Sequence, residues 1–358
     1  MRQIEYCKTC ILPNTRPNLI FDETGNCNGC ASTIEKETID WDVRKKDFER
    51  IVNQFKKKNQ QYDCIIPVSG GKDSTWQVVK ALEYGLNPLC ITWKTPARNQ
   101  LGMSNLQNLI DLGVNHIDFS INPIVERLFT RKAFEKMGSP VLPMHMALHA
   151  IPLQFAVKFH IPLIIWGENS AFEYGGDNKS LKGSRLNSAW IKDYGVTNGT
   201  SAEDWLDNEL SQSDLAPYFW PSDFEQEKVG VEAIFLGHFF KWDPNHTFKI
   251  AKKNGFKEGK IPKTGFYSFA DIDDEFLITI HHWIKWYKFG FTRLWDNLSL
   301  EIRNKRITRK QAIDIIVDTG NELPHKEISE FCDYIKINEK KFFEIMEKFR
   351  NKKIWKQD

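Results

Sequence analysis

A stretch at positions 67–75, Pro-Val-Ser-Gly-Gly-Lys-Asp-Ser-Thr, combines glycines, hydroxyls, a lysine and a carboxylate. An apolar run that ends at Ile66 precedes it, and an amphipathic run that begins at Trp76 follows it. Strand, turn and helix are therefore predicted in this order, with Gly85 ending the helix. Glycines let the backbone close around an anion, and the first N–H groups of a helix point at it without internal partners. The stretch predicts a phosphate-binding loop.

The order of residues in this loop excludes one common class. A Walker A loop reads Gly-x-x-x-x-Gly-Lys-Ser/Thr, but here Asp73 follows Lys72, and no glycine lies between Gly29 and Gly70. The run Ser69–Ser74 instead resembles the PP-loop of the ATP pyrophosphatases. That resemblance implies a grip on the β- and γ-phosphates and cleavage of ATP between α and β. A chance glycine turn in an ordinary α/β unit is the weaker alternative.

The residues predicted to bind the nucleotide lie at the ends of predicted strands. They are Ser69, Gly70, Gly71, Lys72, Asp73, Ser74, Thr92, Trp93 and Gly167. We expect Thr92 and Trp93 beside the adenine, because this fold places adenine at the end of the second strand. Lys72, Asp73 and Glu168 are the candidate catalytic residues.

Carboxylates beside a triphosphate can hold Mg²⁺, which prefers carboxylate, phosphate and water oxygens. Asp73 is the first candidate ligand, followed by Glu168 or Asp177. A helix cap or a salt bridge explains Glu168 equally well. The acidic residues of 271–274 favour a helix start over a second cation site.

Four of the seven cysteines form two pairs, Cys7-x-x-Cys10 and Cys27-x-x-Cys30. Two such knuckles complete a tetrahedral zinc site with four sulfur ligands. Since four protein ligands leave no open position on the metal, we expect a structural Zn²⁺ rather than a catalytic one.

Other polar residues are less specific. His145 and His149 are four residues apart on a predicted helix, and without a zincin glutamate they favour a polar or partly buried pair over a metal site. The sequence does not choose among the arginines that could pair with a substrate anion, which are Arg185, Arg293, Arg303 and Arg306.

The bulk properties are those of an ordinary globular chain. It has 358 residues, 41% hydrophobic and 27% charged, with a formal net charge of +2. No apolar run is long enough to span a bilayer, and the N-terminus has no signal-peptide core, so we expect a cytoplasmic protein without a membrane partner. The near-neutral charge predicts no large nucleic-acid surface.

Short apolar strands alternate with helices, which predicts a doubly wound parallel α/β sheet whose ligands bind at the carboxyl ends of the strands. The predicted strands span 64–68, 88–93, 116–121, 162–166 and 231–237. One helical stretch is predicted over 124–159.

The expected domains follow from these elements. They are a zinc ribbon at 1–35, a linking helix at 36–61, a PP-loop ATP-binding α/β domain at 62–270 and a helical C-terminal region at 271–358. A polar insertion at 173–226 is expected to cover the substrate, because long loops in compact domains are usually functional.

The ordered set of motifs resembles the N-acetyl sugar amidotransferase family, of which WbpG and PseA are named members. The matching pieces cover nearly the whole chain: both cysteine pairs, Ser69–Ser74, 166–169, 173–176, 234–243, 286–291 and 302–308. The resemblance implies an ATP-dependent ligase, forming AMP and pyrophosphate, that converts an acetamido group of a nucleotide-linked diacetamido sugar into an acetamidino group. Such a reaction belongs to bacterial surface polysaccharide (LPS O-antigen) or flagellar sugar synthesis.

The resemblance also implies ATP and Mg²⁺ as cofactors and two protein partners. The partners are similar to the subunits of imidazole glycerol phosphate synthase: a glutaminase, and a barrel that conducts ammonia. Two other functions compete with this one. A PP-loop enzyme of tRNA 2-thiolation needs further sulfur or Fe–S ligands, and the remaining cysteines, Cys64, Cys90 and Cys332, sit in apolar or helical runs. A degenerate scaffold would not need the intact loop.

Overall fold

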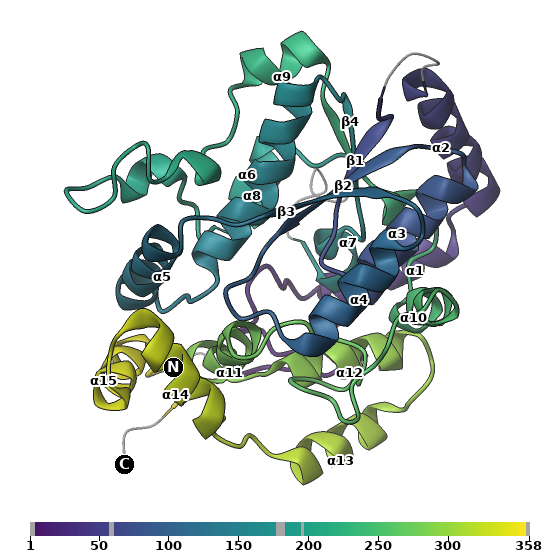
Figure 1. Cartoon of the computed structure of the whole chain (residues 1–358). Coiled ribbons are helices and arrows are strands. Elements are labelled where there is room, and N and C mark those ends of the chain that lie inside the picture. Colours follow the sequence, from purple (N-terminus) through teal and green to yellow (C-terminus); the bar gives the residue numbers. More distant parts are fainter. Residues whose placement is uncertain (1–3, 57–60, 177–182, 195–196, 356–358) are drawn as a thin grey trace.

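In the computed structural model, residues 4–56, 61–176, 183–194 and 197–355 are described (Figure 1). A sheet of five parallel strands, in the order β3-β2-β1-β4-β5, forms the centre. The strands are β1 (Cys64–Pro67), β2 (Pro88–Trp93), β3 (Asn115–Phe119), β4 (Leu163–Trp166) and β5 (Glu232–Phe235). All five were predicted, and their bounds differ from the prediction by two residues or fewer.

The strand order contains one topological switch. From β1 the chain moves outward through β2 to β3, then returns to the other side of β1 to place β4 and β5. The carboxyl ends of β1 and β4 therefore meet beside the switch, which is where ligands bind in open α/β sheets. The predicted doubly wound parallel sheet is confirmed.

Helices cover both faces of the sheet because alternate strand residues point to opposite sides. Ile65 of β1 packs into the core cluster that holds the apolar residues of α5 (Pro123–Met137) and α6 (Leu142–Phe159). Ile66 packs on the other side with α2 (Trp41–Phe55), α3 (Lys72–Glu83) and α4 (Gln100–Ile110). Helix α10 (Pro244–Lys253) lies against α3.

The prediction of a single helical stretch over 124–159 is wrong in one respect, because the structure has two helices there, α5 and α6. Gly138 ends α5 in the left-handed region at φ +58, and α6 begins only after Val141. A Cβ at Gly138 would lie 2.6 Å from the ring of Phe349, so the break also lets the C-terminal helix pack closely.

The C-terminal helices lie together on one side of the sheet, at the bottom of Figure 1. They are α11 (Leu277–Phe289), α12 (Arg293–Arg303), α13 (Arg309–Thr319), α14 (His325–Ile335) and α15 (Glu339–Phe349). The capping box predicted at Thr308 and Gln311 starts α13. The predicted cap Asn338 starts α15 by accepting the backbone N–H of Lys341 at 2.8 Å.

Short elements fill the rest of the described chain. They are α1 (Asn28–Glu37), α7 (Ser170–Tyr174), α8 (Ser188–Tyr194), η2 (Ala202–Trp205), η3 (Ala216–Tyr218), α9 (Asp223–Val229) and η4 (Leu236–His238). Trp190, Trp205 and Leu215, in the predicted insertion 173–226, are buried in the same core cluster as α6. The domain boundaries stay a prediction.

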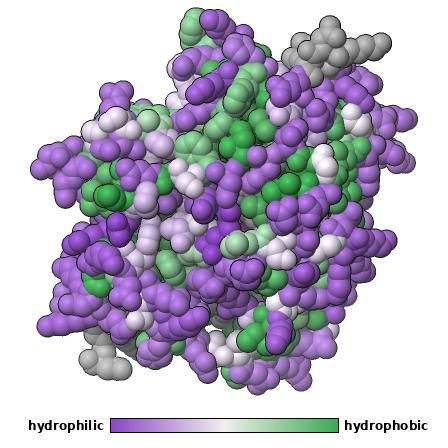
Figure 2. Space-filling view, viewed as in Figure 1, coloured by the Kyte–Doolittle hydropathy of each residue, from purple (hydrophilic) through white to green (hydrophobic). Residues whose placement is uncertain are grey.

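Hydrophilic residues dominate the face shown in Figure 2, and hydrophobic residues form only interrupted patches on it. No helix in the described ranges is long and apolar enough to cross a membrane.

Candidate functional site

The predicted phosphate loop connects β1 to α3 and depends on glycine at position 70. Gly70 has φ +85, and a Cβ there would lie 2.6 Å from the backbone N of Leu106. Gly71 is the N-cap of α3, and Ser74 and Thr75 both donate their hydroxyls to its carbonyl at 3.0 Å. The loop therefore presents the amino end of a helix at the sheet's switch point, which is an arrangement that favours anions.

Asp73 is the best-anchored side chain of the loop. Its Oδ1 accepts hydrogen bonds from the indole Nε1 of Trp242 at 3.0 Å and from Oγ1 of Thr247 at 2.9 Å. Its other oxygen contacts the ammonium of Lys72. Trp242 follows the fifth predicted strand, and because the carboxyl ends of parallel strands lie at one edge of the sheet, its segment is predicted to meet the loop; the structure places it there. Thr247, on α10, carried no sequence signal.

Glu168 faces the loop from the end of β4. A Cβ at the preceding Gly167 would lie 2.5 Å from Nε2 of Gln77, so the end of β4 packs directly on α3. Burial, with the nearby charge of Asp73 as a second cause, raises the pKa of Glu168 to about 7, against the opposing effect of Lys72. A carboxyl group with such a pKa can accept or donate a proton near neutral pH.

The two predicted adenine contacts are held by the neighbouring strand and helix. Thr92 shares a hydrogen bond with Nε2 of His116 at 2.8 Å. The indole of Trp93 donates to Oε1 of Glu126 at 2.8 Å, and burial raises the pKa of Glu126 to about 7. Both strand residues lie in the wall of the cavity described next.

A cavity of about 450 Å³ opens over the loop. Of the predicted nucleotide-binding and catalytic residues, all but Gly70 line it: Ser69, Gly71, Lys72, Asp73, Ser74, Thr92, Trp93, Gly167 and Glu168. Asp177, a further predicted Mg²⁺ ligand, lies outside the described residues. The structure thus brings together residues from three separate segments, which lie at the carboxyl ends of β1, β2 and β4. We call the cavity over the phosphate loop the loop cavity.

Other residues of the loop cavity were missed or left undecided by the sequence. Arg98 and Phe269 line it without any motif to mark them. Asp274 accepts the backbone N–H of Ile278 near the start of α11, as predicted for a helix start, yet Asp273 and Asp274 also line the cavity. His149, which stacks on Trp166 with ring centroids 4.9 Å apart, forms another part of the wall.

Of the four candidate arginines, only Arg293 lines the loop cavity. Its Nε is buried without a hydrogen-bond partner, 3.7 Å from a carboxylate oxygen of Asp271. Arg185 and Arg306 form ion pairs with carboxylates away from the loop cavity, at 2.9 and 2.6 Å. Arg303 lies at the cysteines.

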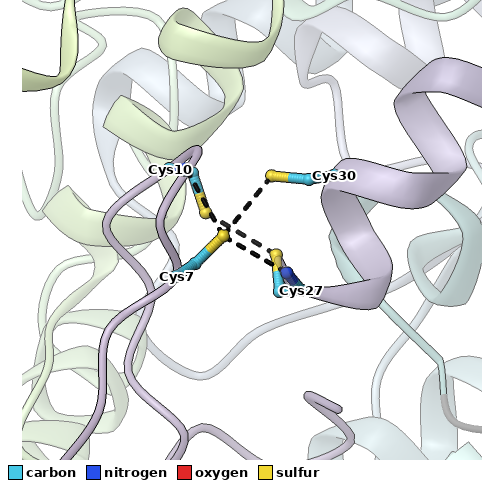
Figure 3. A group of neighbouring side chains, drawn as sticks. All are labelled: Cys7, Cys10, Cys27 and Cys30. Atoms are coloured by element: carbon cyan, nitrogen blue, oxygen red, sulfur yellow. Dashed lines mark hydrogen bonds between the residues drawn. The ribbon is translucent and has the colours of Figure 1, made fainter. Parts of the chain in front are cut away.

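The four paired cysteines converge, as shown in Figure 3. Their Sγ atoms all lie within 4.8 Å of one another, with Cys7–Cys30 at 3.8 Å and Cys10–Cys27 at 3.6 Å. A tetrahedral zinc ion with Zn–S bonds of about 2.3 Å requires sulfurs roughly 3.8 Å apart. The donor set therefore fits Zn²⁺ in a closed site, as predicted for a structural metal.

Arg303 of α12 covers this cluster. Its Nη2 lies 3.5 Å from Sγ of Cys27 and 3.7 Å from Sγ of Cys10, and its Nη1 donates to the carbonyl of Glu173 at 3.0 Å. Gly29 is needed here, because a Cβ would lie 2.6 Å from Nη2. The guanidinium offsets part of the negative charge that four thiolates carry around a divalent ion.

A buried chain of contacts links the cluster to the loop cavity. Lys36 lies on α1, the helix that carries Cys30, and its Nζ donates to both carboxylate oxygens of Glu173 at 2.7 and 2.8 Å. The same Nζ donates to the carbonyl of Trp242 at 2.7 Å. Because Trp242 in turn donates to Asp73, the cysteine-bearing helix helps to position the loop.

The parallel sheet with its Ser-Gly-Gly-Lys-Asp-Ser loop at the switch point defines a PP-loop-type α/β protein with a four-cysteine cluster. Residues 263–358 match the model of the family described as "LPS biosynthesis protein WbpG-like, C-terminal domain". The chain is therefore WbpG-like in its C-terminal domain, and the resemblance inferred from the sequence is confirmed there.

A curated relative and two solved structures also match. The uncharacterized protein MJ1599 of Methanocaldococcus jannaschii is 32% identical over 87 residues, which are 24% of this chain and 31% of that protein, so the chain spans about a third of its length. An NMN synthetase from Francisella tularensis is 15% identical with a TM-score of 0.28, covering 63% of this chain and 99% of that one. An NH3-dependent NAD synthetase from Campylobacter jejuni is 16% identical with a TM-score of 0.29, covering 63% and 100%.

Proposed function

We propose that this protein is an ATP-dependent amidotransferase that converts an acetamido group of a nucleotide-linked sugar into an acetamidino group. One observation carries the proposal: the chain joins a PP-loop cavity to a WbpG-like C-terminal domain, and Arg293 of that domain lines the same cavity. The family description names LPS biosynthesis, so we place the reaction in bacterial surface polysaccharide or flagellar sugar synthesis.

The first chemical step activates the amide. An amide oxygen is a poor leaving group, so the acetamido oxygen attacks the α-phosphorus of ATP, the bond between α-phosphorus and bridging oxygen breaks, and pyrophosphate leaves. The loop amides and Lys72 stabilise the charge on the departing pyrophosphate. Mg²⁺ held by Asp73, whose carboxylate lines the loop cavity, would neutralise the same charge.

The second step replaces the oxygen. Ammonia attacks the imidate carbon, the carbon–oxygen bond breaks, and AMP carries away the former amide oxygen. The added nitrogen must lose a proton, and Glu168, whose pKa is raised to about 7, is placed in the loop cavity to accept it. The net reaction consumes ATP and ammonia and yields the acetamidino sugar, AMP and pyrophosphate.

We propose a separate source for the ammonia. A glutaminase with a cysteine nucleophile needs a reactive thiol, and the three cysteines outside the cluster, Cys64, Cys90 and Cys332, are all at most 3% exposed. Burial raises the pKa of Cys90 to about 12 and that of Cys332 to about 11. The same buried thiols give no support to tRNA thiolation. A glutaminase and an ammonia-conducting barrel are the partners we propose.

Mass spectrometry with isotopic labels tests the function. The protein is incubated with ATP, Mg²⁺, heavy-nitrogen ammonium and UDP-linked diacetamido sugars whose acetamido oxygen is labelled. We expect the heavy nitrogen in the sugar product and the labelled oxygen in AMP, because the amide oxygen departs with AMP.

Two other outcomes would contradict the proposal. Labelled AMP without nitrogen in the sugar would retain adenylylation but exclude amidine synthesis. Absence of ATP cleavage, even with a glutaminase and a barrel partner added, would favour a nucleotide-binding scaffold.

A further inference from the structure

A second cavity, of about 220 Å³, lies beside the loop cavity and has no part in the proposed chemistry so far. The ribbon segment 16–18, the break between α5 and α6, and helices α11 and α12 form its walls. Asn18 donates to the carbonyl of Tyr194 at 2.8 Å, and Thr15 donates to the carbonyl of Phe289. These contacts hold the ribbon against the helices that line the cavity.

The two cavities share their helices. On α11, Ile278 lines the loop cavity and Lys285 lines the second cavity. On α12, Arg293 lines the loop cavity and Asp296 lines the second cavity. Seven residues of α-helix, the interval from Ile278 to Lys285, cover about 10 Å. One extended ligand can therefore contact both cavities along the same pair of helices.

The second cavity carries an excess of positive charge. Arg16, Lys285 and Lys288 line it, and Asp296 is the one carboxylate among its described lining residues. Nε of Arg16 lies 2.8 Å from Oδ1 of Asp296, and Nζ of Lys285 lies 3.6 Å from Oδ2. Lys288 donates to the carbonyl of Met137 at 3.0 Å rather than to a carboxylate. Arg16 and Lys285 therefore share one carboxylate, Lys288 has none, and these four side chains carry a net charge of +2.

These charges are largely removed from water, which makes the excess costly. The side chains of Arg16 and Lys285 are 11% and 19% exposed. Burial lowers the pKa of Lys285 to about 8, with Arg293 and Arg16 adding to the decrease and Asp296 and Asp271 opposing it. His281, at the same wall, has a pKa well below its usual range, chiefly through burial, and is neutral. An anion bound beside Lys285 would relieve this repulsion.

We propose that the second cavity binds the diphosphate of the nucleotide-linked sugar, while the acetamido group of the same ligand reaches the loop cavity. The inference rests on the proposed function. The diphosphate of such a sugar carries two negative charges, one on each phosphate, and so balances the net charge of +2, whereas a sugar carboxylate would neutralise one positive charge. The cavity is smaller than the roughly 300–1,000 Å³ of sites that enclose a whole drug-sized ligand, so the nucleoside lies outside it.

Calorimetric titration of the intact protein with uridine diphosphate tests this site, with uridine and glucuronate as the phosphate-free probes. Lys285→Met should weaken binding of uridine diphosphate by at least about tenfold, since a hydrogen bond to a charged group is lost. Lys326→Met is the matched control, because its side chain is 71% exposed on α14 and lines neither cavity. Lys72→Met reports any binding at the ATP loop.

A measurement on the unmodified protein covers the case in which Lys285→Met does not fold. Because Lys285 has a pKa of about 8, an anion bound to it should draw a proton from the buffer near that pH. The binding heat should then vary with the ionisation enthalpy of the buffer, and the variation should disappear about two units lower, where Lys285 is already charged.

The outcomes separate this inference from the proposed function. If binding of uridine diphosphate is unchanged in Lys285→Met and lost in Lys72→Met, the phosphate site is overturned. Tighter binding of glucuronate than of uridine diphosphate also overturns it. If the label experiment shows no amidine while uridine diphosphate binding depends on Lys285, the phosphate site stands and the proposed reaction fails. If amidine forms and Lys285→Met leaves the KM for the sugar unchanged, the reaction stands and the site fails.

Discussion

The cysteine cluster and the loop cavity both contain charged groups, but these groups differ in burial and in whether they have partners. The four cysteines are at most 4% exposed. Arg303, itself 6% exposed, contacts the sulfur atoms of Cys10 and Cys27. In the loop cavity, Glu168 and Asp273 are half-buried, and Nε of Arg293 has no hydrogen-bond partner. A closed set of satisfied ligands stabilises the fold, whereas an open set of partly satisfied groups is available to a substrate.

The two regions are nevertheless connected. The buried contacts from α1 through Lys36 to Trp242 and then to Asp73 extend from the helix that carries Cys30 to the loop. Damage to the two regions should therefore have different effects. Substitutions in the loop cavity should remove activity and spare the bound zinc, and substitutions in the cluster should first remove the zinc.

The largest effect is expected for Asp73→Asn, which removes the charge that holds Lys72 and the proposed Mg²⁺. Turnover of ATP to AMP and pyrophosphate should fall by at least about 100-fold. Zinc content and the far-ultraviolet circular dichroism spectrum should stay at wild-type values. Turnover within a few fold of wild type would show that the loop has been assigned the wrong role.

Cys27→Ser tests the other region. Loss of one of four ligands should remove zinc and lower the melting temperature, because metal binding and folding are coupled in such sites. Zinc is measured by elemental mass spectrometry and melting by calorimetry. Retained zinc and melting temperature together with lost activity would contradict a structural cluster and place it in the chemistry.

Trp242→Phe tests the connection. The change keeps an aromatic ring near Lys72, whose Nζ lies 5.6 Å from the indole centroid, but removes the hydrogen bond to Asp73. We expect kcat to fall about tenfold, as for loss of one hydrogen bond to a charged group, with the KM for ATP and the zinc content nearly unchanged.

The control is Trp205→Phe, which removes an indole donor that bonds to Thr200 at 3.1 Å, outside the loop cavity. If the two variants lose kcat equally, Trp242 has only a general structural role and the connection is not supported.

The smallest effect concerns pH. A carboxyl group whose pKa is raised from about 4.3 in the unfolded chain to about 7 in the fold stabilises the protein most below the lower value. Its contribution is lost as pH rises through about 7, because the unfolded state ionises first. The melting temperature of Glu168→Gln, relative to wild type, should therefore increase between pH 5 and pH 8.

Glu126→Gln should show the same trend, since burial raises the pKa of Glu126 to about 7 as well. It does not line the loop cavity. The two variants should differ in activity, with Glu168→Gln impaired and Glu126→Gln close to wild type. If Glu168→Gln and Glu126→Gln have equal activity, Glu168 does not act as the proton acceptor.

Features that depend on residues close in sequence could be predicted from the sequence. The loop, the two cysteine knuckles and the caps at Thr308 and Asn338 each use groups only a few positions apart, so local chemistry determines them. The alternation of apolar runs likewise determined the parallel sheet. The break at Gly138 also had a local signal, a glycine followed by serine and proline, although a continuous helix was predicted.

Only the tertiary structure decided which distant groups meet. The order of the strands predicted that the segment of Trp242 meets the loop, but not that its indole bonds to Asp73, 169 positions away. Arg303 reaches Cys27 across 276 positions, and no periodicity or motif encodes such side-chain pairs. The second cavity has the same origin, since its cations come from the ribbon and from α11. A spacing pattern reports what one segment can do by itself, whereas packing brings segments together and sets the burial and charge that determine what their side chains do.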